Sequence, residues 1–306
     1  MSFALQDSLC EEEIMLVASV REFARSVLEP QAVALEEQSE ESLSEILKKS
    51  GSIGLAAALL PEAAGGEGMS IKGFMLALEE IAVCSAGVSA ALLSHNAALL
   101  TLDSSPGLNL PRPAPTDLLS LLLPGEVRRC DGKVRGESSF AVNGPLAVGL
   151  AGLCGDTIYY AVAGEGAGIE VRPLEKQMGF RPARIGTVKF EDYACPYACG
   201  VEQEVQGALS LVRLGSAAIS LGLMRCALAN AADYARGRYQ GGDIIINHQE
   251  IRLMLGNMLS NYYTAKSALL QASSTYRRWP DKSLSLAAKI TATTGASYSA
   301  ENAVQI

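Results

Sequence analysis

Histidine is scarce in this sequence and the cysteines are not grouped, which limits its metal chemistry. Among 306 residues there are two histidines, His95 and His248, far apart and without ligand-like neighbours. Cys195 and Cys199 form a CxxxC pair, but no second pair completes a set of four ligands. We therefore expect no metal site. Seven scattered cysteines, an odd number, indicate reduced thiols in a cytoplasm-like compartment.

Signals for nucleic-acid binding, membrane insertion and export are also missing. The net charge is −8 and there is no basic tract, which argues against a nucleic-acid partner. No uncharged apolar run reaches the roughly 18 residues that span a bilayer. The acidic start, MSFALQDSLCEEEIM, differs from a secretory signal or a mitochondrial transit peptide. We expect a cytoplasmic protein without a membrane span.

Aromatic residues make up only 6% of the chain, while alanine and leucine dominate, a composition that favours helices. Helical periodicity covers the N-terminal region, with Pro30 interrupting the first helix and a break near Ser85. We expect an all-helical domain over residues 1–103. Long helical patterns return over residues 207–306, and long helices with short connections form antiparallel bundles.

Residues 104–206 have a different pattern. The connector SSPGLNLPRPAP opens this region, and segments with a period of two follow it, separated by turns such as Asp131-Gly132 and Asn143-Gly144. This pattern predicts a small antiparallel β domain. The expected fold class is therefore α+β: helices, then a β domain, then a helical bundle.

Several motifs then resemble the acyl-CoA dehydrogenase family, in family order and over nearly the whole chain. The first is a helix end followed by Pro-Glu and a glycine-rich turn, and the others are a helix with a central histidine, a strand with an Asn-Gly turn, a strand pair and a bundle segment. They read GLAAALLPEAAGGEGMS, GVSAALLSHNAAL, GESSFAVNGPLA, EKQMGFRPARIGTVKFEDYACP and ARGRYQGGDIIINHQEIRLMLGNM.

The resemblance implies a flavoenzyme of fatty acid metabolism. Family members use FAD to desaturate an acyl-CoA thioester between Cα and Cβ. A glutamate base removes the α-proton, hydride goes to the flavin, and electrons pass on to electron-transferring flavoprotein. The thioester carbonyl must be hydrogen-bonded as enolate character develops, and the flavin carries the redox step. The family also implies a homo- or hetero-oligomer, a dimer or a tetramer.

The resemblance assigns candidate flavin contacts in the β domain. Phe140 occupies the position of an aromatic residue beside the flavin ring. Val142 stands where a Thr or Ser normally hydrogen-bonds the polar edge of the flavin. Valine cannot form this hydrogen bond, and the loss of the bond costs about 1 kcal/mol. The alternative is that both are alternating core residues of a strand. The family's Thr-Glu-Pro…Gly-Ser-Asp loop is missing; PAPTDLLSLLLPGEVRRCDGK replaces it, and we expect Leu118–Leu123 to pack on the core.

Two further candidates lie in the bundle segment. Arg238 matches an arginine that reaches the flavin pyrophosphate across a subunit contact, a role that suits the paired donors of a guanidinium. The alternative is an arginine that interacts with the dipole of a helix end. Gln249 matches a position near the same interface.

The catalytic base is the decisive departure from the family. In most members the glutamate follows a glycine-rich segment after a helix that ends much like ENAVQI, the last residues here. The helix ends without a cap, so we expect an incomplete bundle that lacks the C-terminal segment. At the minority position of the base this chain has Val212, followed by Arg213, which we expect to shape the site or to lie on the helix surface. His95 is expected to be a polar core residue.

Two functional hypotheses follow. In the first, the chain is a flavin-dependent acyl-CoA dehydrogenase that is inactive by itself without its last segment. In the second, it is a catalytically inactive homologue that acts as a structural subunit of a mixed oligomer. A generic helical binding module would leave the ordered motifs unexplained. The sequence does not determine the acyl chain length.

Overall fold

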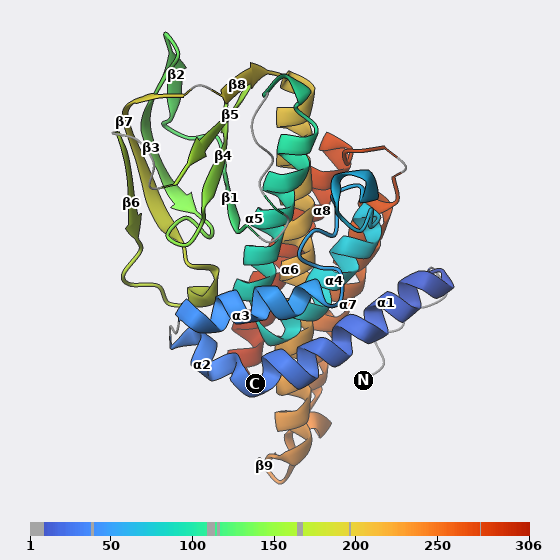
Figure 1. Cartoon of the computed structure of the whole chain (residues 1–306). Coiled ribbons are helices and arrows are strands. Elements are labelled where there is room, and N and C mark those ends of the chain that lie inside the picture. The colour runs from blue at the N-terminus through green and yellow to red at the C-terminus, as the bar shows by residue number, and fades with distance from the viewer. Residues whose placement is uncertain are drawn as a thin grey trace.

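The computed structural model describes residues 9–37, 40–108, 114, 117–163, 168–195, 197–275 and 277–306. Its elements follow the expected order of helices, strands and helices. Figure 1 shows the strands gathered on one side, beside a stack of long helices. Much of the connector predicted after the first helical region lies outside the described residues.

The N-terminal helices contain the break that the sequence predicts. Ser85 separates α4 from α5 and caps α5, with its Oγ accepting the N–H of Val88 at 3.3 Å. Near Pro30 the chain passes through a π-helical turn and a 3₁₀ turn before it becomes α-helical again, since proline cannot donate a helical hydrogen bond. The elements are α1 (Glu11–Phe23), η2 (Ala24–Leu28), η3 (Glu29–Gln31), α2 (Ala32–Glu36), α3 (Glu40–Gly51), η4 (Glu62–Ala64), α4 (Ile71–Cys84), α5 (Ala86–Asp103) and η5 (Pro106–Leu108).

The middle region consists of two four-stranded sheets, in the orders β1-β4-β5-β8 and β2-β3-β7-β6. Apolar side chains from both sheets pack together, with Tyr159 and Phe190 in an edge-to-face contact at a centroid distance of 5.7 Å. The elements are β1 (Leu119–Leu122), β2 (Arg128–Cys130), β3 (Lys133–Ala141), β4 (Gly149–Cys154), β5 (Thr157–Val162), β6 (Ile169–Pro173), η6 (Arg181–Ala183), β7 (Gly186–Ala194) and β8 (Tyr197–Gly200).

One strand pair departs from the expected antiparallel pattern. β1 pairs with β4 in parallel, because β2 and β3 in the other sheet form the crossover between them. The residues of β1 are all buried, which confirms that this segment packs on the core. The predicted Asn143-Gly144 turn is present. Asn143 has a φ of +66° and its Nδ2 donates to the carbonyls of Ala91 and Leu119, at 2.9 and 3.1 Å.

The third part consists of long helices around α6, and glycines bring this helix close to the N-terminal helices. A Cβ at Gly215 would lie 2.3 Å from Leu93 on α5, and one at Gly222 would lie 2.5 Å from Ala82 on α4. Asp281 caps α8 by accepting two backbone N–H groups at 2.9 Å. The elements are α6 (Glu202–Gly237), β9 (Tyr239–Gln240), β10 (Asp243–Ile244), η7 (Ile245–Asn247), α7 (Gln249–Ser273) and α8 (Lys282–Gln305).

Helix α6 is also long and apolar enough to cross a membrane by length and composition alone. However, 72% of its most apolar window is buried inside the protein. This burial is what a core helix shows, and one such helix is weak evidence for a membrane span.

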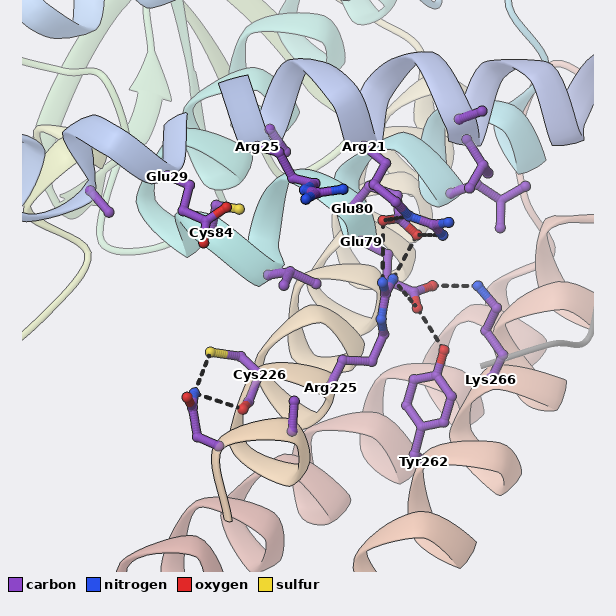
Figure 2. A pocket seen from close by; sticks show the side chains of 18 of the residues that line it. Arg21, Arg25, Glu29, Glu79, Glu80, Cys84, Arg225, Cys226, Tyr262 and Lys266 are labelled. Carbon is purple, nitrogen blue, oxygen red and sulfur yellow. Dashed lines mark hydrogen bonds and ion pairs between the residues drawn. The ribbon is translucent and has the colours of Figure 1, made fainter. Parts of the chain in front are cut away.

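A buried ionic cluster joins the N-terminal helices to α6 and α7 (Figure 2). Glu79 accepts hydrogen bonds from Tyr262 at 2.8 Å and from Lys266. Glu80 accepts two hydrogen bonds from Arg21, both at 3.1 Å. Arg225 bonds both carboxylates, at 3.3 Å to Glu79 and at 2.6 Å to Glu80. Two adjacent buried carboxylates are thus compensated by cations from three other elements.

The charge state of Glu80 follows from these contacts. Burial by itself raises the pKa of Glu80, but the hydrogen bonds from Arg21 and Arg225 outweigh it and hold the pKa below its ordinary value of 4.5. A carboxyl group whose pKa is lowered by folding stabilises the protein above its unfolded pKa. That stabilisation is lost as the pH falls through the folded pKa.

We predict that Glu80→Gln lowers the stability at neutral pH by about 3 kcal/mol, because it leaves partly buried cations without their carboxylate. The difference in Tm from the unmodified chain should shrink as the pH falls below 4.5. Glu45→Gln is the matched control. It breaks an exposed pair with Lys49 at 2.7 Å, so its Tm should stay close to that of the unmodified chain. Equal effects of the two substitutions would contradict the assignment.

Candidate functional site

A small apolar cavity lies where the β domain meets the helices. Its volume is about 250 Å³. The β domain contributes β1, β3 and the segment around η6, and the helices α5, α6 and α8 complete the wall. The lining residues are Ala90, Leu93, Ser94, Leu121, Leu123, Phe140, Val142, Phe180, Ile185, Val212, Ser216, Ile219, Ser220, Leu223 and Thr293. All three parts of the fold therefore contribute to one site.

The polar groups of the cavity are four hydroxyls, and each already has a local partner. Ser94 donates to the Val142 carbonyl at 3.3 Å and accepts the N–H of Leu121 at 3.1 Å. Ser216, Ser220 and Thr293 donate to carbonyls of their own helices, each at 2.8 Å. Among the described residues, no acidic, basic or histidine side chain lines this cavity. The cavity therefore favours an uncharged, apolar group.

The backbone around η6 is strained where it meets the cavity. Phe180 has a φ of +61° and Arg184 a φ of +43°, values that non-glycine residues seldom adopt. Gly87, near the start of α5, lets Pro182 approach, since a Cβ there would lie 2.7 Å from the proline ring. Strained residues that line a cavity are often functional. Of the two strained residues, Phe180 lines the cavity.

Phe140 and Val142, the candidates for ring contacts, meet at this cavity. Phe140 is 57% exposed, so it is not a core residue of its strand. Val142 follows the end of β3, partly buried beside the hydroxyl of Ser94.

Arg213 follows the cavity-lining Val212 on α6. One of its guanidinium nitrogens is buried and has no hydrogen-bond partner among the described residues. His95 is buried and its Nδ1 accepts the N–H of Leu119 at 3.2 Å, as expected for a polar core residue.

Arg238 and Gln249 lie elsewhere in the fold. Arg238 directly follows the last residue of α6, and its side chain is exposed and donates to Gln240 at 3.3 Å. Gln249 opens α7 and is also exposed. Figure 1 shows β9, next to Arg238, at the end of the molecule opposite the strands. The structure therefore does not bring these two residues to the cavity of their own chain.

Several residues of the cavity were not predicted from the sequence. Ser216, Ser220 and Leu223 share one face of α6 with Val212, and their spacing of three and four residues was the available signal. The signal was ambiguous because α6 is apolar or small on most of its surface. Phe180 could not be found in this way, because its position depends on an unusual backbone conformation.

Two family models match the chain at its two helical parts. One, described as acyl-CoA dehydrogenase, N-terminal domain, matches residues 10–104, and one described as acyl-CoA dehydrogenase, C-terminal domain, matches residues 202–306. An acyl-CoA dehydrogenase from Bacillus subtilis is 27% identical over 307 aligned positions, covering 88% of this chain and 80% of that protein. A subunit of a caffeyl-CoA reductase–Etf complex from Acetobacterium woodii is 26% identical over 299 positions, covering 86% and 79%.

Solved structures extend the likeness to the whole fold. A glutaryl-CoA dehydrogenase from Mycobacterium smegmatis, in complex with FADH2, matches with a TM-score of 0.84 at 17% identity. The match covers 99% of this chain and 86% of that one. At such low identity it shows the fold alone. The expected fold class is thereby confirmed.

We predict that the Asn143 turn stabilises the wall of the cavity. Asn143→Ala removes two buried hydrogen bonds and places an alanine at a φ of +66°, so it should cost about 2 kcal/mol or more. Asn143→Gly loses the same bonds without the strain. The glycine variant should therefore be more stable than the alanine variant by about 1 kcal/mol in urea unfolding. Equal stabilities would show that the backbone conformation contributes nothing.

Proposed function

The chain belongs to the acyl-CoA dehydrogenase family, and we propose that it is a flavoprotein that takes FAD and an acyl-CoA thioester, with their reacting groups at the cavity beside Phe140. The observation that carries the proposal is the apolar cavity built jointly by the β domain and the helices. The proposed reaction is α,β-desaturation of the acyl group. The lack of charged lining residues favours an uncharged acyl chain over one that ends in a carboxylate.

The residues of the cavity fit the ring system of a flavin. Phe140 presents an exposed aromatic side chain, and Val142 adds an apolar surface beside it. The buried, unpartnered nitrogen of Arg213 is a donor that suits an anionic or carbonyl oxygen. Arg238 and Gln249 are the proposed contacts for the flavin phosphates of a second copy of the chain, since they lie away from their own cavity.

In the proposed reaction, FAD, the apolar side chains and Arg213 have separate roles. When bound, FAD supplies the acceptor for the hydride that leaves Cβ. The apolar side chains exclude water and align the acyl chain, while Arg213 offers positive charge on α6 next to the cavity. Among the described residues no carboxylate lines the cavity, so none of them supplies the base for the α-proton.

The proposal extends to partners and location. We propose that the chain forms a homo- or hetero-oligomer, which would bring Arg238 to a neighbouring flavin, and that it passes electrons to electron-transferring flavoprotein. The relative named as a subunit of an Etf complex supports the second point. The cysteines in the described part of the chain are free thiols, which supports a reducing, cytoplasmic location. A role in fatty acid metabolism is proposed from the family alone.

We predict that Arg238→Gln weakens FAD binding about tenfold, the loss expected for a charge-assisted hydrogen bond. Titration of the visible flavin absorption measures the affinity, and light scattering should show an oligomer of unchanged mass. Arg236→Gln is the control, because Arg236 is a nearby exposed arginine that pairs with Asp233 at 2.6 Å. A monomeric mass, or equal affinities of the two variants, would contradict the proposal.

We further predict that the purified 306-residue chain with FAD does not desaturate acyl-CoA substrates, because no carboxylate among the described residues lines the cavity. Val212→Glu places a carboxylate in the cavity and should produce measurable turnover with an artificial electron acceptor. Val212→Gln, of similar size but without a charge, is the control and should remain inactive. Turnover by the unmodified chain would overturn this prediction.

A second candidate function is a catalytically inactive subunit of a mixed oligomer. The observation that favours it is the apolar side chain of Val142 in the cavity, at the position where the family resemblance expects a Thr or Ser to bond the polar edge of the flavin. A purified chain that stays colourless after incubation with FAD would support this candidate. Flavin bound by the chain alone would support the first.

A further inference from the structure

A second, larger cavity lies on another side of α6 and shares no lining residue with the first. Its volume is about 690 Å³, within the range of small-molecule sites. Figure 2 shows the helix that carries Arg21 and Arg25 along one side of it and the helices that carry Arg225 and Tyr262 along the other. The first wall is formed by α1, η2, η3 and the start of α2, and the second by α4, α6 and α7.

The charges around this groove do not balance. Its cationic side chains are Arg21, Arg25, Arg225 and Lys266, and its anionic ones are Glu29, Glu79 and Glu80. Glu79 and Glu80 are already engaged by Arg21, Arg225 and Lys266. Arg25 forms no ion pair or hydrogen bond with any part of the chain that the structure describes. Among the described residues the Glu29 carboxylate forms none either, so the lining as a whole carries one positive charge in excess, and Arg25 is its cation without a carboxylate partner.

The backbone that carries Arg25 is unusual. Ala24–Leu28 forms a π-helical turn, a rare conformation that often occurs at functional sites. A π turn changes the direction of the following side chains relative to a regular α-helix. Figure 2 shows the Arg25 guanidinium directed into the space between Glu29 and Arg21. The turn thus presents the available cation to the groove.

The remaining lining separates into two ends. Near one end, burial and the charge of Glu29 raise the pKa of the Cys84 thiol to about 11, so this thiol is neutral at neutral pH and adds no negative charge. Toward the other end, α1 and α4 contribute apolar side chains, among them Val17, Ala18 and Leu76. A ligand with its anionic head beside Arg25 would reach these side chains by lying along α1 across the Arg21–Glu80 ion pair.

We propose that this groove binds an amphipathic monoanion, a medium-chain alkyl carboxylate, with its head on Arg25 and its chain against Val17, Ala18 and Leu76. The charge complementarity fixes the head group, and the apolar wall fixes the tail. The proposal is independent of the function proposed above, since the two cavities share no residue.

Isothermal titration of the purified full chain with sodium decanoate tests this proposal. Decanoate should bind, and decan-1-ol, which lacks the charge, should bind at least tenfold more weakly. Arg25→Gln, at an exposed position where folding is not at risk, should weaken decanoate binding about tenfold. Val17→Trp should block the path of the tail and weaken binding as well.

Two control variants locate the site. Arg236→Gln removes an exposed arginine outside the groove, and Leu223→Trp narrows the other cavity. Both should leave the affinity for decanoate unchanged. The proposal is overturned if decanoate does not bind, if decanol binds equally well, or if Leu223→Trp rather than Arg25→Gln weakens binding.

Discussion

The structure depends on the burial of two adjacent carboxylates, Glu79 and Glu80, in a helix whose other buried residues are apolar or glycine. Consecutive residues on a helix point about 100° apart, so these two groups face different neighbours. Glu79 faces α7 and Glu80 faces α1, while Arg225 on α6 contacts both. Two like charges are costly to bury unless cations reach them. The rotation of α6 and the positions of α1 and α7 around α4 are therefore fixed together.

This constraint also determines the apolar cavity at the β domain. Once Arg225 must face α4, the face of α6 that carries Val212 and Ser216 is turned toward β1 and β3. Gly215 strengthens this arrangement, because it lets α5 approach so closely that a side chain there would overlap Leu93. The cavity wall is thus set by an ion pair that lies outside it. Loss of the ionic cluster would change the shape of the cavity without touching a single lining residue.

Local signals in the sequence predicted most of the fold and only part of the site. The break at Ser85 and the turn at Asn143 could be predicted, because caps and turns are determined by residues that are neighbours in the sequence. The parallel pairing of β1 with β4 could not be predicted, since it depends on β2 and β3 pairing within the other sheet. Phe140 was predicted from family resemblance. Phe180 was not, because its place depends on a left-handed backbone that only tertiary contacts hold.

One helix, α6, lines two cavities of opposite character. At the β domain, the lining residues that the structure describes carry no formal charge, so this cavity can take an uncharged chain without leaving a buried charge unpaired. Farther along α6, Arg225 belongs to a cluster in which cations exceed carboxylates, and that groove suits an anion. The two preferences have one origin. The carboxylates of α4 hold Arg225 on one face of α6, beside the cations of α1 and α7, and the opposite face of α6 carries the uncharged residues that line the other cavity.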